Sequence, residues 1–299
     1  MRSILQRSFI IKRSLFIICF FVPIFSLSAA DALTFYVDST VKKARQTGSE
    51  ESPFSSVAQA VDAGYKAKRG KGGVQISSKP VSIILCSDVY IDEALLITFP
   101  LKISGIENPT IRFGDNAGFV AARTTLEING CTLTRSEYFT EPRTVPILYS
   151  SRSTIKLNGV SLTVKEGGDA VILRGGQFTC TDTVMTSEQN AQAVLVRAQQ
   201  STITVSDSTF FAAGLAALCF DLKNTRAAFT KTTCTVLPQY TGTIAELKNS
   251  RIKLQEMQCS YSSPVFELGD AAFAADATSK LEGEDALSLF GFSEVLIEK

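Results

Sequence analysis

Short stretches of alternating apolar and polar residues recur along most of the chain. Their starts are 23 to 29 residues apart, at Leu101, Leu126, Ile155, Phe178, Ile203, Ala227 and Ile252. Since side chains at even offsets of a strand share one face, residues two positions into each stretch should face inward. All of them are apolar: Ile103, Ile128, Leu157, Cys180, Val205, Phe229 and Leu254. A second apolar column follows seven residues into the stretches, from Leu133 to Cys259.

A repeat of this length predicts an all-β solenoid. Most coils carry a second short strand before the turn, such as "AVILR" and "AVLVR". In a parallel β-helix each coil covers the core of its neighbour and is not stable alone. The spacing is too regular for a β-sandwich, so the pattern favours a parallel β-helix.

One segment near the start has helical spacing instead. In "ESPFSSVAQAVDAG" (51–64) and the residue after it, Phe54, Val57, Val61 and Tyr65 fall on one face. Ser56, with Gln59 three residues later, predicts a helix N-terminus. An open solenoid exposes the core and strand edges of its first coil, so we expect this helix to act as a lid. The run "ALSLFGFSEVLIEK" (286–299) would close the other end.

The front of the chain resembles a known superfamily. "TFYVDS" (34–39), the Pro-Phe turn and helix, "VSIILCSDVYIDEALLI" (81–97) and "PLKISGIENPTIRF" (100–113) are similar to the N-terminal portion of secreted pectate-lyase-like proteins. The resemblance implies a right-handed parallel β-helix with an N-terminal capping helix. It implies no single activity, because the superfamily holds lyases, hydrolases, epimerases and proteins without known catalysis.

The first thirty residues are predicted to be a signal peptide. Four basic residues precede the apolar run 15–25, and "SLSAA" ends in small residues; an uncleaved N-terminal anchor is the alternative. We expect an exported protein, periplasmic or at the cell surface, without a transmembrane segment in its mature chain. Residues 31–299 are interpreted as one domain, divided into an N-terminal strand and capping helix (31–80), coils (81–265) and a C-terminal cap (266–299).

Composition excludes several functions. Removing the leader takes four of 30 basic residues and none of 29 acidic ones, which leaves 26 − 29 = −3 and does not indicate a nucleic-acid partner. The basic run "KAKRGKGG" (66–73) is interpreted as a solvated helix end, where cations suit the helix dipole. The chain has no histidine, which excludes His-based triads and His-containing zinc sites.

Six cysteines remain after the leader. Cys234 and Cys259 share one column in adjacent coils, at a separation that a disulfide can span. A disulfide and an unbonded core ladder are equally compatible with this spacing. Cys86 and Cys180 lie within apolar strand patterns and should behave as small hydrophobic residues.

Two outward columns carry charge. The first holds Arg174, Arg197, Asp221 and Glu246, and the second holds Asp182, Asp207, Lys231 and Glu256. Both could be ion-pair ladders on the solenoid surface. The sharper alternative is a polysaccharide groove in which Asp182 and Asp207 are paired carboxylates and Arg197 is a base, since lyases of the resembled superfamily use an Arg or Lys near an acidic cluster that often binds calcium. We assign no catalytic residue or metal ligand, and no cofactor apart from calcium in the lyase alternative.

Three loop tyrosines are further candidates. Tyr138, Tyr240 and Tyr261 leave the repeat at corresponding places, where tyrosines can stack on sugars or anchor a protein partner. The leading hypothesis is a non-catalytic cell-envelope protein that binds polysaccharide or protein along a solenoid face. The alternatives are a polysaccharide lyase or glycoside hydrolase with an acidic and arginine-lined groove, and an adhesin or passenger-like module.

Overall fold

The computed structural model describes residues 32–299 except 43–44, 70–78, 136–144, 165–168, 189–193, 261–265, 283–286, 292 and 298–299. At 215–217, 238–242, 282 and 290 it describes the backbone alone. The predicted leader, residues 1–30, lies outside these ranges. Asp31–Lys299 form one compact unit.

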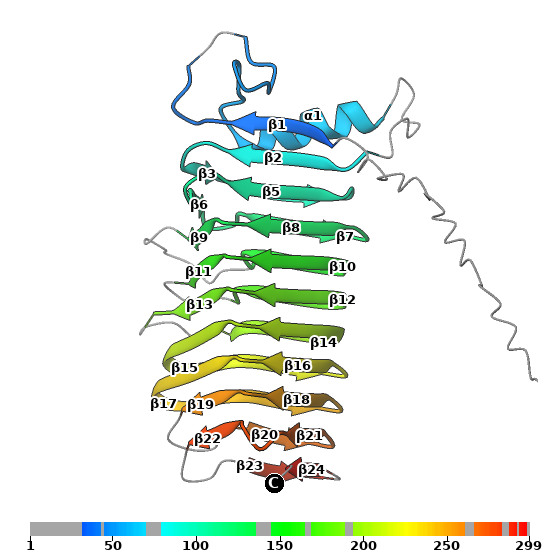
Figure 1. Cartoon of the computed structure of the whole chain (residues 1–299), viewed down its shortest axis with the longest axis vertical. Coiled ribbons are helices and arrows are strands. Elements are labelled where there is room, and N and C mark those ends of the chain that lie inside the picture. Colours follow the sequence, from blue (N-terminus) through cyan, green and yellow to red (C-terminus); the bar gives the residue numbers. More distant parts are fainter. Residues whose placement is uncertain are drawn as a thin grey trace, which may run out of the picture. The chain divides into compact units, whose positions relative to one another are not determined.

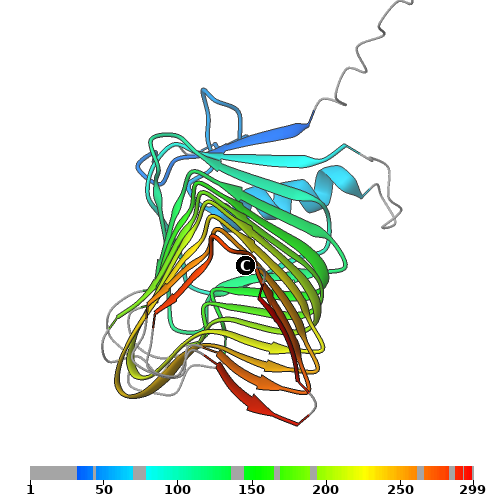
Figure 2. The same cartoon turned by 60° about the horizontal axis from the view of Figure 1, so that its bottom comes forward.

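That unit is a parallel β-helix whose coils are stacked one on the next (Figure 1). Figure 2 shows the coils superposed around a common interior. We call its three sides faces A, B and C, in the order in which the chain meets them. Face A consists of β1 (Leu33–Val37), β2 (Val81–Leu85), β5 (Leu101–Gly105), β8 (Thr125–Asn129), the later parts of β10 (Leu148–Asn158), β12 (Val171–Thr181) and β14 (Val194–Ser206), then β16 (Arg226–Thr230), β18 (Arg251–Gln255), β21 (Ala272–Ala275) and β24 (Glu294–Ile297).

The other two faces are built in the same way. Face B consists of β3 (Val89–Ile91), β6 (Thr110–Phe113), β9 (Thr132–Arg135), β11 (Ser161–Val164), β13 (Val184–Ser187), the first parts of β15 (Thr209–Lys223) and β17 (Thr233–Lys248), β19 (Gln258–Ser260) and β22 (Lys280–Glu282). Face C consists of β4 (Ala94–Ile97), β7 (Gly118–Ala122), the first parts of β10, β12 and β14, the later parts of β15 and β17, β20 (Phe266–Gly269) and β23 (Leu287–Phe290).

The register confirms the predicted inward columns. Residues from Ile103 to Leu254 lie opposite one another on face A, and each is at most 1 % exposed. The column from Leu133 to Cys259 is likewise continuous and buried on face B. The all-β parallel β-helix predicted from the repeat is therefore the observed fold.

Two corners of the coil share one device, a residue with positive φ followed by a buried hydroxyl. Between faces C and A, the Thr225 N–H donates to Ser250 Oγ in the next coil (3.1 Å), and that hydroxyl donates to the Lys248 carbonyl (2.9 Å). Between faces A and B, Ser208 Oγ accepts from the Thr183 N–H (3.2 Å) and donates to the Ser206 carbonyl (2.7 Å). These ladders satisfy backbone groups where the chain leaves one sheet for the next.

The helix α1 (Val57–Lys68) lies against the first coil, as predicted (Figure 1). Ser56 is its N-cap and accepts from the Gln59 N–H (3.3 Å). Val57 and Val61 are buried in the core, and Tyr65 Oη donates to the Leu96 carbonyl (3.0 Å) on the first strand of face C. The helix thus covers apolar residues of the first coil.

The segment predicted as a C-terminal cap consists of further coil strands. β20, β21 and β22 continue the three faces, and β23 and β24 begin another coil. Leu289, Leu296 and Ile297 on these last strands are more than half exposed.

Candidate functional site

Arg197 on β14 is the centre of an ion-pair cluster on the outer side of face C. Its Nε donates to Asp169 Oδ2 (2.8 Å), and its Nη1 donates to Asp221 Oδ2 (2.5 Å). Asp221 lies opposite Arg197 in the next coil, as predicted. The hydrogen bond that Arg197 donates to Asp169 raises the pKa of Arg197 above its ordinary range. The guanidinium is therefore held in its charged form by two carboxylates, which does not suit a base.

The same column continues as a row of acids. Glu246 lies opposite Asp221, and Glu267 lies opposite Glu246. Loss of solvent around the Glu246 carboxyl, and then the charges of Glu267 and Asp221, raise its pKa, while Arg197 opposes this shift. One arginine thus offsets only part of the negative charge along the column.

Arg174 does not belong to this column, contrary to the prediction. It lies opposite Gln199, and the residue opposite Arg197 is Ile172. The prediction assumed that the shorter coil loses residues between face C and face A. The register across that corner is unchanged, so the shortening lies earlier in the coil and the column stays six residues before the strand start.

Asp182 and Asp207 lie at the corner between faces A and B. They occupy equivalent positions in adjacent coils, with φ of 47° and 50°. The width of face A separates this corner from the Arg197 cluster, which precedes face A in the coil. The structure therefore does not bring Arg197 together with Asp182 and Asp207, and the predicted groove of paired acids and a basic arginine is not formed.

The three candidate tyrosines stay predictions. Tyr138 and Tyr261 lie outside the described residues. Tyr240 lies on β17, where only the backbone is described.

The six cysteines that follow the leader are free thiols. Cys234 and Cys259 lie directly opposite one another on face B, as the column predicted, and both are buried. Burial raises the pKa of both thiols well above the ordinary range, and it raises the pKa of Cys180 to about 11. Cys86, expected to pack as a small hydrophobic residue, is exposed, because β2 ends one residue before it.

Face A carries a shallow hollow that the sequence analysis did not find. Its volume is about 680 Å³, and it lies over β14, β16, β18, β21 and β24. Small residues, Ala228, Ala272 and Ala274, form its floor, and exposed Thr202, Thr204, Arg226, Arg251 and Lys253 surround them. The strands of face A were predicted from their inward, apolar positions, whereas the residues of the hollow occupy the outward positions. The alternation of long basic and small side chains at those outward positions could have indicated the hollow.

The three cations of this hollow face no partner in the part of the chain that the structure describes. Arg226, Arg251 and Lys253 take part in no ion pair with another described residue, and Glu294 is the acidic residue among the described lining. Arg226 and Arg251 are opposite one another in adjacent strands. The hollow thus presents unneutralised positive charge around a small-residue floor.

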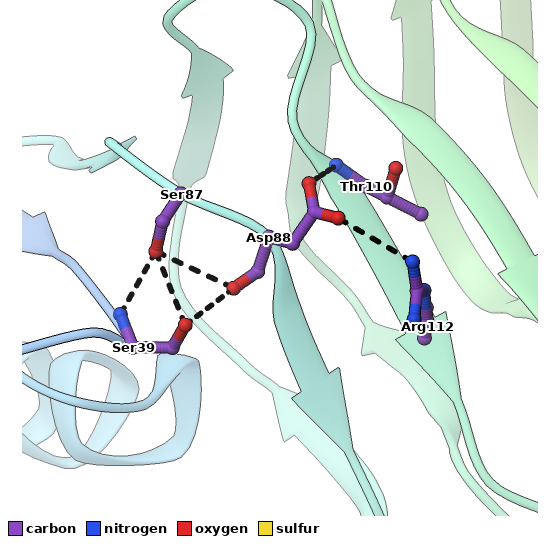
Figure 3. A network of polar contacts seen from close by, with 5 residues as sticks. All are labelled: Ser39, Ser87, Asp88, Thr110 and Arg112. Atoms are coloured by element: carbon purple, nitrogen blue, oxygen red, sulfur yellow. Dashed lines mark hydrogen bonds and ion pairs between the residues drawn. The ribbon is translucent and has the colours of Figure 1, made fainter.

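A further polar cluster joins the first coils at the corner between faces A and B (Figure 3). Asp88 accepts from the Thr110 N–H (2.8 Å) and pairs with Arg112 (3.5 Å), while Ser39 Oγ donates to the Asp88 carbonyl (2.6 Å). Ser87 Oγ accepts from the Ser39 N–H (2.9 Å). Because these groups form hydrogen bonds and an ion pair with one another, we interpret the cluster as a structural link between the first coils.

Among the described residues, no helix is long and apolar enough to cross a membrane. No group of three or more cysteine, aspartate or glutamate side chains in the described ranges is arranged to hold a metal ion.

Comparison with known proteins gives one structural match. No family model and no curated protein matches the chain. A crystal structure of a GH136 lacto-N-biosidase from Eubacterium ramulus is similar with a TM-score of 0.40 and 9 % sequence identity, over 89 % of this chain and 68 % of that one.

Proposed function

We propose that this protein is an exported, non-catalytic β-helix protein of the cell envelope that binds an acidic glycan along face A. Export is inferred from the leader-like residues 1–30. The capping region and the coil repeat support a relation to the pectate-lyase-like superfamily, as a protein that keeps the scaffold for binding.

The hollow on face A is the observation that carries the proposal. Unpaired arginines recognise carboxylates through two parallel hydrogen bonds, and Arg226 and Arg251 lie one strand apart, about 4.8 Å. Lys253 adds a third positive charge, and the hydroxyls of Thr202 and Thr204 supply neutral hydrogen-bonding groups. An extended chain that carries an acid at regular intervals would meet these groups in succession.

The surface is open and shallow, which favours a polymer over an enclosed small molecule. The outward column that contains Arg226 continues towards the N-terminal end through Thr202, Gln177, Thr154 and Thr125. Thr202 belongs to the hollow, and the other three polar side chains extend the surface beyond it. A glycan could therefore follow face A across several coils.

The experiment measures binding of the purified protein to polygalacturonate, with dextran as the neutral polymer, by titration calorimetry. The double variant Arg226→Ala/Arg251→Ala should weaken binding to the acidic polymer by about tenfold or more, because two charge-assisted contacts are lost. The matched control is Arg174→Ala/Lys223→Ala, which removes two exposed cations from face C and should bind normally.

Two outcomes would overturn the proposal. One is binding to polygalacturonate that the face A variant leaves unchanged. The other is release of reducing ends or unsaturated products that disappears in Arg197→Ala, which would make the protein a polysaccharide-degrading enzyme.

A further inference from the structure

A second hollow lies where the end of α1 meets the corner between faces C and A. Its volume is about 590 Å³. The last turn of α1 forms one wall, and the corner residues of four successive coils, between β4 and β5, between β7 and β8, on β10 and on β12, form the other. It therefore depends on elements that the hollow over β14–β24 does not use.

Four cations line this second hollow: Lys68, Arg69, Arg123 and Arg152. Its described lining contains no acidic residue. Lys68 is only 5 % exposed. Within the described chain its ammonium has no hydrogen bond or ion pair, and neither Arg123 nor Arg152 has an ion-pair partner there. The side chain is therefore largely buried, but its unpartnered ammonium is not among the buried polar atoms and borders the hollow, where it adds to the positive charge of the two corner arginines.

The helix dipole does not account for Lys68. Cations near a helix C-terminus stabilise it while they remain exposed at the surface, and Lys66 has that position, exposed and paired with Asp62 (2.5 Å). Lys68 lies on the buried side of the same turn. The sequence-based interpretation of this basic run as a solvated helix end is therefore wrong for Lys68.

Arg123 and Arg152 have a backbone conformation that is unfavourable for arginine. Arg123 and Arg152 both have φ of 52°, a conformation that Gly and Asn adopt more readily. Four later coils have such residues at the equivalent position, Gly175, Asn224, Asn249 and Gly291, and the other two have Gln200 and Asp270. Among the described corner residues with positive φ, arginine occurs in two of the coils that line the hollow, although the backbone conformation alone favours asparagine or glycine there.

An unpartnered hydroxyl supplies a further, independent indication. Thr124 Oγ1 lines the hollow, is buried, and has no hydrogen-bond partner. In later coils the equivalent hydroxyls donate to the carbonyl two residues earlier, as Ser201 does to Gln199 (2.9 Å). Buried polar atoms without a partner are rare and call for an explanation, and a bound oxyanion would accept this hydrogen bond.

We propose that this hollow is a binding site for an oxyanion, the carboxylate, sulfate or phosphate group of a small ligand. Lys68 provides an ammonium group at the end of a largely buried side chain, Arg123 and Arg152 provide planar guanidinium donors from the corner, and Thr124 provides a hydroxyl donor. Arg69, whose guanidinium lies 5.8 Å from the Tyr65 ring centroid, borders the opening. The two hollows share no residue, although Thr125, Thr154 and Gln177 of the second hollow also lie on the outward column along which the glycan is proposed to continue. The variants below therefore separate the two sites through their cations.

The test is titration calorimetry of the purified protein at low ionic strength with sodium sulfate, sodium phosphate and methyl glucuronide. Methyl glucoside is the neutral control. The key variant is Arg123→Asn/Arg152→Asn, because asparagine suits a positive φ. We expect at least a tenfold loss of affinity for the anions with an unchanged or higher melting temperature, a combination that a structural role for the arginines would not give.

Two further variants make the result specific. Lys68→Met keeps the buried stem and removes the charge, so it should also lose binding. Arg226→Ala/Arg251→Ala removes two cations of face A and should lose the polymer. The small-anion titrations are repeated in this variant, where face A contributes least, and the binding that remains there should be the part lost on Lys68→Met. Tighter binding of the glucuronide than of sulfate would identify an acidic sugar as the ligand, and equal binding would identify a simple oxyanion.

The proposal is overturned if the unaltered protein binds none of the three anions in a saturable manner. It is also overturned if the corner double variant and Lys68→Met bind them as well as the unaltered protein does, or if the melting temperature of the corner variant falls together with its affinity.

Discussion

At the scale of single residues, backbone conformation explains one of the two charged columns. Asp182, Asp207, Lys231 and Glu256 share a φ between 47° and 51° at the corner between faces A and B. Two earlier coils have glycine there, Gly130 and Gly159. The feature that this column repeats from coil to coil is thus a left-handed backbone conformation and not a charge. Aspartate tolerates it better than lysine or glutamate does.

Replacing Lys231 by asparagine should therefore stabilise the protein. We expect Lys231→Asn to raise the free energy of unfolding by about 0.5–1 kcal/mol, since part of the strain at positive φ is relieved. Urea denaturation measures the change. Lys223→Asn, on an exposed strand position, is the control and should give no gain; equal effects of both changes would refute the conformational explanation.

Glu246 should make the protein less stable as the pH rises. Its pKa is raised in the folded protein, so the folded state binds more protons than the unfolded state between the ordinary value near 4.5 and the raised one. Stability is lost as the pH increases through this window. Glu246→Gln should consequently stabilise the protein at pH 7, by no more than about 1 kcal/mol at this exposed position, and should have no such effect at pH 4.

Thermal melts of both proteins at the two pH values check this. Glu93→Gln, an exposed change far along the solenoid from Glu246, serves as the control. A benefit of Glu246→Gln that persisted undiminished at pH 4 would show that the charge is not its cause.

At the scale of elements, the hydroxyl ladders hold successive corners together. Thr225 Oγ1 accepts from the Ser201 N–H of the preceding coil (3.4 Å) and donates to the Lys223 carbonyl of its own (3.0 Å). Both residues are buried. One side chain thereby links two coils where the strands themselves have ended.

Thr225→Val keeps the shape of the side chain and removes this link. We expect a loss of about 1–3 kcal/mol in the free energy of unfolding, because the Ser201 N–H is left buried without an acceptor. Chemical denaturation measures it, and Thr202→Val, on the exposed side of β14, should stay within about 0.5 kcal/mol of the unaltered protein. Equal losses would mean that the ladder contributes nothing specific.

The strands could be predicted from the sequence, whereas the sites could not. Inward positions such as Ile103 and Phe229 repeat at fixed spacing, and burial allows only apolar residues there, so period and register follow directly. Arg174 was misplaced because charge at an outward position has no such constraint, and one wrong assumption about coil length moved it by two residues. The second hollow, at the end of α1, is lined by both Lys68 and Arg152. No local sequence pattern connects residues so far apart in the chain.

At the scale of the whole molecule, each coil contacts only its neighbours, so its stability should be local. In such a stack, stability is close to a sum of coil terms and interfaces between adjacent coils. Phe266 and Phe273 pack in the last coils with ring centroids 5.1 Å apart. Phe273→Ala should lower the free energy of opening, measured by amide hydrogen exchange, by about 3–5 kcal/mol in β20–β24. It should leave the exchange of β1–β8 unchanged.

Hydrogen exchange resolved along the chain distinguishes the two ends. Ile103→Ala is the reciprocal variant and should affect the coils around β5 first. A uniform loss of protection from β1 to β24 in either variant would mean that the solenoid unfolds as a single unit.

The stacking order also determines how this chain can acquire its structure. Nearly every strand pairs with the equivalent strand about 25 residues earlier, so the sequence distance between partners stays the same along the molecule. With α1 and the first coil formed, each later coil needs only the previous one as a template. Assembly can therefore proceed in the direction of synthesis, one coil at a time, with only the newest edge exposed.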